Sequence, residues 1–263
     1  MKSGAELLFI ISALPVFLIG MYIYKKDLQK EPTKLLVKLF LGGIGACFLV
    51  LAIDIVIRLT MPVATFDEAR KLGFFPLLIY VFIGVALLEE FSKYIFLYKL
   101  SYKDSEFDEL YDGIVYGVFV ALGFAFFENL FYVFSLGFVT GVFRGIFAVP
   151  GHACDGALMG YYLGLAKYHS LYDDQKLERR NIFLSLLIPT ISHGIYDFSI
   201  STKNGYFYIF FLVFVICMYI YILKKIKEIS SIRRKMKYND NFCPNCGIKV
   251  ESNFCPYCGR KNE

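Results

Sequence analysis

Seven apolar segments, each long enough to cross a lipid bilayer, constrain this chain more than any other feature. A membrane-spanning helix needs about 20 mainly apolar residues. Only 19% of the 263 residues are charged, whereas a soluble domain averages about 25%. The sequence therefore predicts an all-α, polytopic membrane helix bundle with about seven transmembrane helices. The segments are 4–24, 35–57, 74–98, 113–136, 142–166, 181–201 and 205–223.

The distribution of Lys and Arg predicts how the bundle is oriented. The connections 25–34, 99–112 and 167–180, together with 224–240, carry 17 of these residues, and the connections on the other side carry six. Positive residues concentrate on the cytoplasmic side of membrane proteins. We therefore expect an extracytoplasmic N-terminus and a cytoplasmic C-terminus in a multi-pass protein of the cell membrane.

The C-terminal region contains two copies of one cysteine motif. "NFCPNCG" is followed twelve residues later by "NFCPYCG". Four thiolates suit tetrahedral Zn²⁺, and a glycine after each pair permits the tight turn that the metal requires. The pattern predicts a structural zinc in a closed, non-catalytic ribbon. The expected ligands are Cys243, Cys246, Cys255 and Cys258.

These features divide the chain into three predicted parts. Residues 1–223 form the transmembrane domain, 224–240 a basic juxtamembrane linker, and 241–263 the zinc ribbon. The net charge of +5 lies mostly in loops and in the linker, which indicates contact with anionic lipid and not with nucleic acid. The ribbon either binds a cytosolic partner or caps the chain; the sequence favours neither reading.

Ionisable side chains recur in four consecutive apolar segments. Such groups are costly in lipid and normally face the bundle interior or a water-filled cavity. Counted at 1.5 Å per residue from the cytosolic helix ends, the central groups lie roughly 14–23 Å deep. We therefore expect one polar layer in mid-membrane. Its members are Glu89, Glu90 and Lys93, then Glu128 and Asn129, then His152 and Asp155, and finally His193 and Asp197.

Local spacing predicts how this layer is arranged. Lys93 lies three residues after Glu90 and four after Glu89, so it can neutralise one of the two carboxylates. Small residues at intervals of four, at 113–125 and at 156–164, allow close helix packing. Pro150 and Pro189 precede the two histidines and are expected to kink their helices.

The motifs "EEFSK", "FAFFENLFY", "GHACDG" and "HGIYD" occur in this order on successive segments. In this combination the chain resembles the PrsW family of intramembrane proteases and, more distantly, the CAAX prenyl proteases and bacteriocin-processing enzymes. The resemblance covers residues 74–200 and implies peptide-bond hydrolysis within or beside the membrane. Some members of the family act on an anti-sigma factor at its extracytoplasmic side, which implies a membrane protein substrate.

The resemblance also implies roles for individual residues. Glu89 and Glu90 match the double-glutamate motif. The CAAX relatives typically have a histidine in the second motif and an asparagine in the last, where this chain has Glu128 and Asp197. That departure favours the PrsW branch and argues against prenylated substrates. The implied catalytic residues are Glu89, Glu90, Glu128, His152, His193 and Asp197, supported by Lys93 and Asn129.

Two hydrolytic mechanisms fit these residues. In the first, one glutamate activates water as general base, and a histidine donates to the oxyanion or the leaving group. In the second, His152, His193 and a carboxylate hold a catalytic zinc with an open position for water. The absence of an HExxH pair in the sequence favours the first mechanism slightly.

Two functions of other classes also fit these residues. Buried Glu, His and Asp also form proton relays in ion-coupled transporters, although the internal repeat usual in transporters is absent from the sequence. A non-catalytic membrane scaffold or sensor is the third reading. A protein that stays uncleaved when Glu89 is replaced would distinguish the protease from both.

The cysteine motif yields the first testable prediction. The purified protein is expected to contain about one tightly bound zinc per chain, because four thiolates complete one tetrahedral site. Deleting residues 241–263 is expected to remove this zinc, as measured by elemental analysis. Zinc that persists at full occupancy after the deletion would instead belong to the membrane site.

Overall fold

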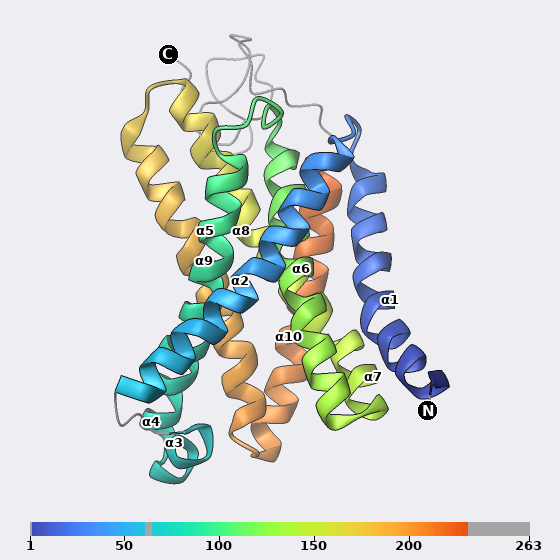
Figure 1. Cartoon of the computed structure of the whole chain (residues 1–263). Coiled ribbons are helices and arrows are strands. Elements are labelled where there is room, and N and C mark those ends of the chain that lie inside the picture. Colours follow the sequence, from blue (N-terminus) through green and yellow to red (C-terminus); the bar gives the residue numbers. More distant parts are fainter. Residues whose placement is uncertain (1, 61–64, 231–263) are drawn as a thin grey trace.

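A computed structural model describes residues 2–60 and 65–230, and within these residues the regular structure is entirely helical (Figure 1). The four cysteines of the predicted ribbon and most of the predicted linker lie outside the described residues. The elements are α1 (Lys2–Lys26), α2 (Thr33–Thr60), α3 (Phe66–Leu72), α4 (Phe74–Ile79), the π-helix η1 (Tyr80–Leu87), α5 (Leu88–Ser101), α6 (Leu110–Leu136), α7 (Phe138–Ile146), α8 (Ala148–Leu171), α9 (Gln175–Ser201) and α10 (Gly205–Ser230).

The prediction of an all-α membrane bundle is confirmed. Six spans of the described chain are long and apolar enough to cross a membrane. They correspond to α1, α2, the continuous α4–η1–α5 unit, α6, α9 and α10, and α6 is the most buried of them. Helix α10 continues to Ser230, so the helix extends into the predicted linker.

The expected segment 142–166 differs from the observed structure. Its residues are divided between α7 and α8, and α8 is not among the six apolar spans. With 24 residues, α8 is about 36 Å long, which is enough to cross a hydrocarbon core of about 30 Å. Most α8 residues are buried against other helices, so this helix does not need a continuous apolar surface toward lipid.

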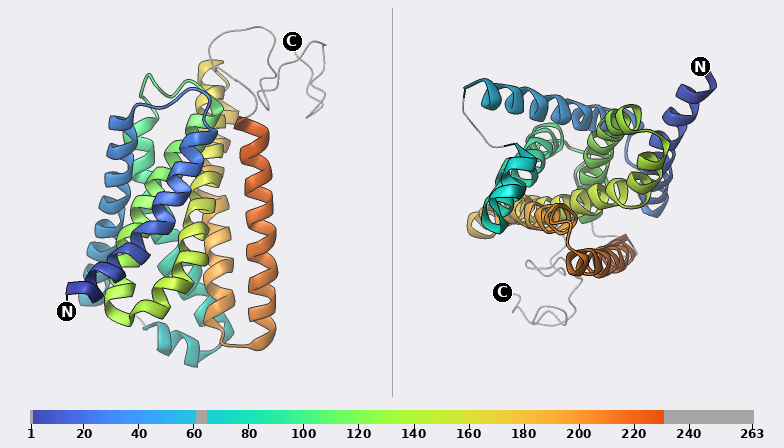
Figure 2. Two further views of the ribbon diagram at one scale, coloured as in Figure 1. Left: turned by 90° about the vertical axis from the view of Figure 1, so that its right-hand side faces the viewer. Right: turned by 90° about the horizontal axis from the view of Figure 1, so that it is seen from below.

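The two ends of the described chain lie at opposite ends of the bundle (Figure 1). The start of α1 shares its end with the short helices α3 and α7, whereas α10 finishes at the other end, near the connections after α5 and α8. Helices α2 and α10 lie on opposite sides of the bundle (Figure 2). This arrangement agrees with an odd number of membrane crossings, as the charge distribution predicts.

The two predicted stripes of small residues pack against each other. A Cβ atom added at Gly113 or Gly117 of α6 would collide with the backbone oxygen of Gly160 or Gly156 of α8, respectively. The backbones therefore touch, which only glycine allows. The contact of Gly43 in α2 with the α6 backbone is of the same kind and was not predicted.

At Pro150 the structure has a break between two helices in place of the expected kink within one. The break falls at Phe147, and Pro150 is the third residue of α8, in the first turn, where a backbone N–H has no intrahelical partner. Pro189 lies inside α9, which continues through it from Gln175 to Ser201. A further irregular segment, η1, lies just before Glu89 and Glu90. π-Helical turns within α-helices occur frequently at functional sites.

A buried carboxylate fastens the connection between α1 and α2 to α6. The Tyr116 hydroxyl of α6 donates a hydrogen bond to Glu31 of this connection. Desolvation by burial, the largest effect, raises the pKa of Glu31 to about 7. At the same end of α6, Asp112 accepts hydrogen bonds from the backbone N–H groups of Asp108 and Glu109, at 3.0 and 2.6 Å. These contacts hold the ends of α1, α2 and α6 in register.

The glycine contact predicts a loss of stability on a small substitution. Replacing Gly160 by Ala places a methyl group against the α6 backbone, and overpacking of this kind costs about 1–3 kcal/mol. We expect a lower thermal unfolding temperature in detergent for Gly160→Ala. Gly205→Ala is the matched control, because a Cβ there meets nothing within 4 Å. Equal unfolding temperatures for the two variants would contradict the close packing of α6 and α8.

Candidate active site

A cavity with a mainly apolar wall and several ionisable side chains lies among η1, α5, α6, α7, α8 and α9. Its volume is about 860 Å³, and Glu89, His152 and His193 line it. The cavity wall also includes Phe66 at the start of α3 and Tyr208 near the start of α10. The cavity therefore extends from the predicted polar layer toward the end of the bundle where the N-terminus lies (Figure 1).

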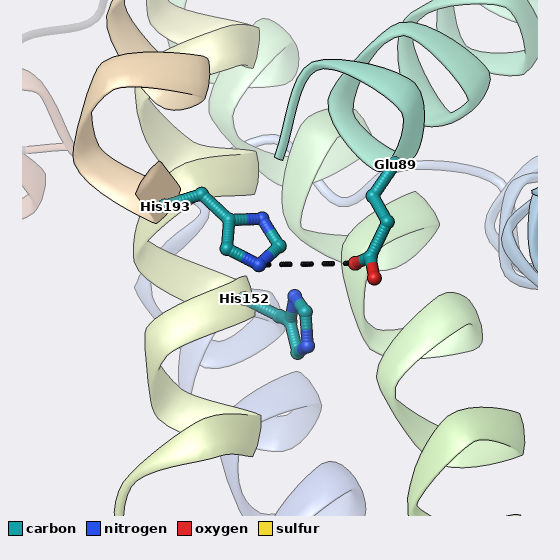
Figure 3. A group of neighbouring side chains, drawn as sticks. All are labelled: Glu89, His152 and His193. Atoms are coloured by element: carbon teal, nitrogen blue, oxygen red, sulfur yellow. Dashed lines mark ion pairs between the residues drawn. The ribbon is translucent and has the colours of Figure 1, made fainter. Parts of the chain in front are cut away.

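Three side chains from three helices converge on this cavity. Glu89 comes from α5, His152 from α8 and His193 from α9, and they point toward one another (Figure 3). Oε2 of Glu89 lies 3.8 Å from Nε2 of His193, and the two imidazole rings meet edge to face with centroids 5.3 Å apart. The buried Oε2 atom of Glu89 has no hydrogen-bond partner within the described chain.

Glu90 and Lys93 form a fully buried ion pair behind these groups. Nζ of Lys93 lies 2.6 Å from Oε1 of Glu90, whereas its distance to Oε2 of Glu89 is 4.0 Å. The same Glu90 oxygen is 2.7 Å from Nδ1 of His193. Glu90 does not line the cavity. The two adjacent glutamates therefore differ: Glu90 is neutralised and holds His193, and Glu89 faces the cavity.

His152 is held at both ring nitrogens. Nε2 lies 2.9 Å from Oε2 of Glu128, and Nδ1 lies 3.2 Å from Nζ of Lys93. Arg144 of α7 donates to that same Glu128 oxygen at 2.6 Å. The Nε atom of Arg144 also donates to Oδ1 of the buried Asn129 at 3.2 Å. The second motif therefore contacts the third through Glu128.

Two aspartates also belong to the polar cluster: Asp197 lies beside His193 in α9, and Asp155 lies in α8 with His152. Asp197 lines the cavity, and its Oδ2 atom is 3.4 Å from Nε2 of His193, one helical turn away. Asp155 lies one turn after His152 in α8 and is almost fully buried. The structure thus brings together all the site residues that the sequence predicted within the membrane, although they come from four separate segments.

Two participants, Arg144 and Asp155, are not among the catalytic residues that the family resemblance implies. Arg144 occurs at the start of an apolar segment, where the sequence predicts a side chain that extends to the outer interface or, in a twisted bundle, approaches the site. It reaches the cavity because α7 is a separate short helix. Asp155 belongs to the polar layer but carries no family assignment; its spacing from His152 was the available signal.

The site contains two groups of side chains that could hold a metal ion. Glu89, His152 and His193 form one group, and Glu90, Asp155 and His193 form the other, each with ligand atoms within 4.8 Å of one another. Two imidazoles and one carboxylate are a usual ligand set for hydrolytic zinc. The first group fits such an ion better, because all three side chains line the cavity and Oε2 of Glu89 has no hydrogen-bond partner among the described residues. Either the Lys93 or the Glu128 contact of His152 would have to open.

The chain is similar to several known proteins. The family model described as "PrsW family intramembrane metalloprotease" matches residues 31–223. A protein named Protease PrsW from Oceanobacillus iheyensis is 34% identical over 84% of this chain and 98% of its own length. The proteins of that name from Clostridioides difficile and Bacillus subtilis are 33% and 32% identical, over 89% and 80% of this chain and 95% and 90% of their own lengths. No solved structure matches the chain.

Proposed function

Because the chain belongs to the PrsW family of intramembrane proteases, we propose that it hydrolyses a peptide bond of a membrane protein that enters the cavity beside Glu89. The observation that carries this proposal is the convergence of Glu89, His152 and His193 at one cavity (Figure 3). The family match favours a peptidase over the transporter and scaffold readings.

In the proposed mechanism, Glu89 takes the proton of the attacking water. Its carboxylate lines the cavity and has an oxygen without a hydrogen-bond partner in the described structure. Glu90 does not contact the water; its hydrogen bond with Nδ1 fixes the ring of His193. Nε2 of this ring is then directed toward Asp197 and Glu89. Imidazoles placed in this way can donate a proton to the leaving amine or stabilise the oxyanion.

The name of the family model also supports a metal-dependent version of this reaction. Glu89, His152 and His193 would hold the ion, and a bound zinc would polarise the scissile carbonyl and acidify a water molecule. Glu90 and Glu128 would then orient the two histidine ligands through hydrogen bonds at their other nitrogens. In both versions Glu89 is the member of the glutamate pair that lines the cavity, and Glu90 supports a histidine.

The cavity indicates the side from which the substrate enters. It extends toward the end of the bundle that carries α3, α7 and the connection between α9 and α10. With the orientation predicted from charge, this end is extracytoplasmic. We propose that the substrate is cleaved in a segment close to its extracytoplasmic membrane border, as expected for a substrate of the anti-sigma-factor type. Aromatic side chains of the wall, including Phe143 and Tyr196, suit an apolar peptide.

Replacing each glutamate by Gln tests the unequal roles. Glu89→Gln is expected to abolish cleavage while the protein accumulates normally, because Gln keeps the size but cannot take a proton. Glu90→Gln is expected to abolish cleavage and also to destabilise the bundle by about 3–5 kcal/mol, because Lys93 loses its buried partner. The measurement compares the membrane proteome of cells that carry each variant in search of one protein that stays uncleaved. Thermal unfolding in detergent measures stability.

The control is Glu6→Gln, because Glu6 is an exposed residue of α1 outside the cavity. His152→Ala and His193→Ala are expected to leave the same protein uncleaved as Glu89→Gln, since residues that act as a unit lose activity together. Full cleavage by both Gln variants would show that the glutamate pair is structural and would refute the assignment.

The orientation can be tested independently of activity. A reporter enzyme that works only in the cytosol is expected to be active when fused after Glu263. The connections rich in Lys and Arg lie at the end of the bundle where α10 finishes, and such connections are normally cytoplasmic. The same reporter fused before Met1 is expected to be inactive, and a reporter that needs export should show the opposite pattern. Export-dependent activity at Glu263 would reverse the topology and move the cavity opening to the cytosolic side.

A further inference from the structure

We infer that Arg144 is a positioning residue of the active site, which holds Glu128 against His152 and thereby joins the α7 wall of the cavity to the catalytic centre. This inference rests on the proposed function, because it assigns Arg144 a role in the same hydrolysis. Three features support this role: the guanidinium group is fixed, it shares an oxygen of Glu128 with His152, and α7 lies beside the cavity.

The guanidinium group is fixed by three residues on one face of α6. Nη2 donates to Glu128 at 2.6 Å, and Nε donates to Asn129 at 3.2 Å. The group also lies over the Tyr132 ring, 4.1 Å from its centroid. Asn129 is in turn fixed from behind, since its Nδ2 atom donates to the backbone oxygen of Ser12 at 3.4 Å. A planar, forked cation held at three points has little freedom to move.

Arg144 and His152 contact the same atom. Oε2 of Glu128 accepts from Nη2 of Arg144 and lies 2.9 Å from Nε2 of His152. Glu128 therefore cannot change its rotamer without breaking both contacts. Without Arg144, the carboxylate would lose its only hydrogen-bond partner besides His152 within the described residues and would be free to turn into the cavity. Such a turn would release the Nε2 side of the imidazole.

The position of α7 explains why this support comes from a separate helix. Phe143 and Phe147, on either side of Arg144 in the chain, line the same cavity. Gly137, which joins α6 to α7, has a φ of +86°, a conformation that favours glycine and lets α7 turn back over the cavity. A peptide in the cavity would press against the wall that carries Arg144. The contact therefore keeps His152 aligned when the cavity is occupied.

Steady-state kinetics of the full-length protein in detergent test this role. The probe is the membrane protein that accumulates uncleaved in cells carrying Glu89→Gln, purified and labelled near its cleavage site. Arg144→Gln is expected to lower kcat by about 10- to 100-fold, the usual effect of removing a group that orients an active-site histidine, with KM changed less than about twofold. Arg144→Lys keeps the charge but not the fork and is expected to recover part of kcat.

A double substitution separates positioning from general packing. If Arg144 acts through Glu128, the variant Arg144→Gln/Glu128→Gln should be no slower than Glu128→Gln alone, because the two residues form one unit. Lys225→Gln is the matched control. Lys225 also makes an ion pair, 3.7 Å from Glu228, and lies over the Tyr161 ring, 5.0 Å from its centroid, and none of these three residues lines the cavity. This control is expected to leave kcat and KM unchanged.

Three outcomes would overturn the inference. A raised KM with unchanged kcat would make Arg144 a substrate anchor. Additive losses in the double variant would show that Arg144 does not act through Glu128. Unchanged kinetics of Arg144→Gln, or of Arg144→Lys if the Gln variant does not accumulate, would remove the role altogether. Failure of the wild-type protein to cleave the probe would contradict the proposed function itself, and so remains distinct from these results.

Discussion

The ion pair between Lys93 and Glu90 is the interaction on which the rest of the site depends. Both side chains are almost completely buried in the middle of an apolar bundle. A lone charge at such a depth would be strongly unfavourable, so each needs a partner. The ammonium group of Lys93 interacts with two further side chains. It contacts Nδ1 of His152 and lies 4.4 Å from the centroid of the Phe124 ring. Glu90 in turn holds His193. One buried cation thus fixes both histidines.

The position of His193 explains how two adjacent glutamates serve one site. Successive residues of an α-helix point about 100° apart, so Glu89 and Glu90 cannot both face the same point. The imidazole lies between them, with Nδ1 toward Glu90 and Nε2 toward Glu89. Gly194 follows His193 in α9, and a Cβ there would collide with the Phe82 side chain of η1. The close approach of α9 to the π-helical segment therefore places His193 at this point.

Most of the architecture was predictable from sequence, because lipid imposes simple requirements on length and polarity. Apolar length located the helices, and the cost of buried charge predicted that polar groups in four segments meet in one layer. The same reasoning failed where tertiary packing determines the local backbone conformation and the helix boundaries. η1 has no distinguishing sequence pattern, since all its residues are apolar. The division of segment 142–166 at Phe147 was missed because α7 and α8 are both apolar at their junction.

The polar residues form one connected chain across five helices. Arg144 in α7 contacts Glu128 in α6, which contacts His152 in α8; Lys93 and Glu90 in α5 then lead to His193 in α9. Every link involves at least one ionisable group in a low-dielectric setting, where hydrogen bonds are strong and unpaired groups are costly. A substitution at one link therefore leaves a charge without its partner at the next. The connectivity that aligns the two histidines also couples the stability of the bundle to the integrity of its active site.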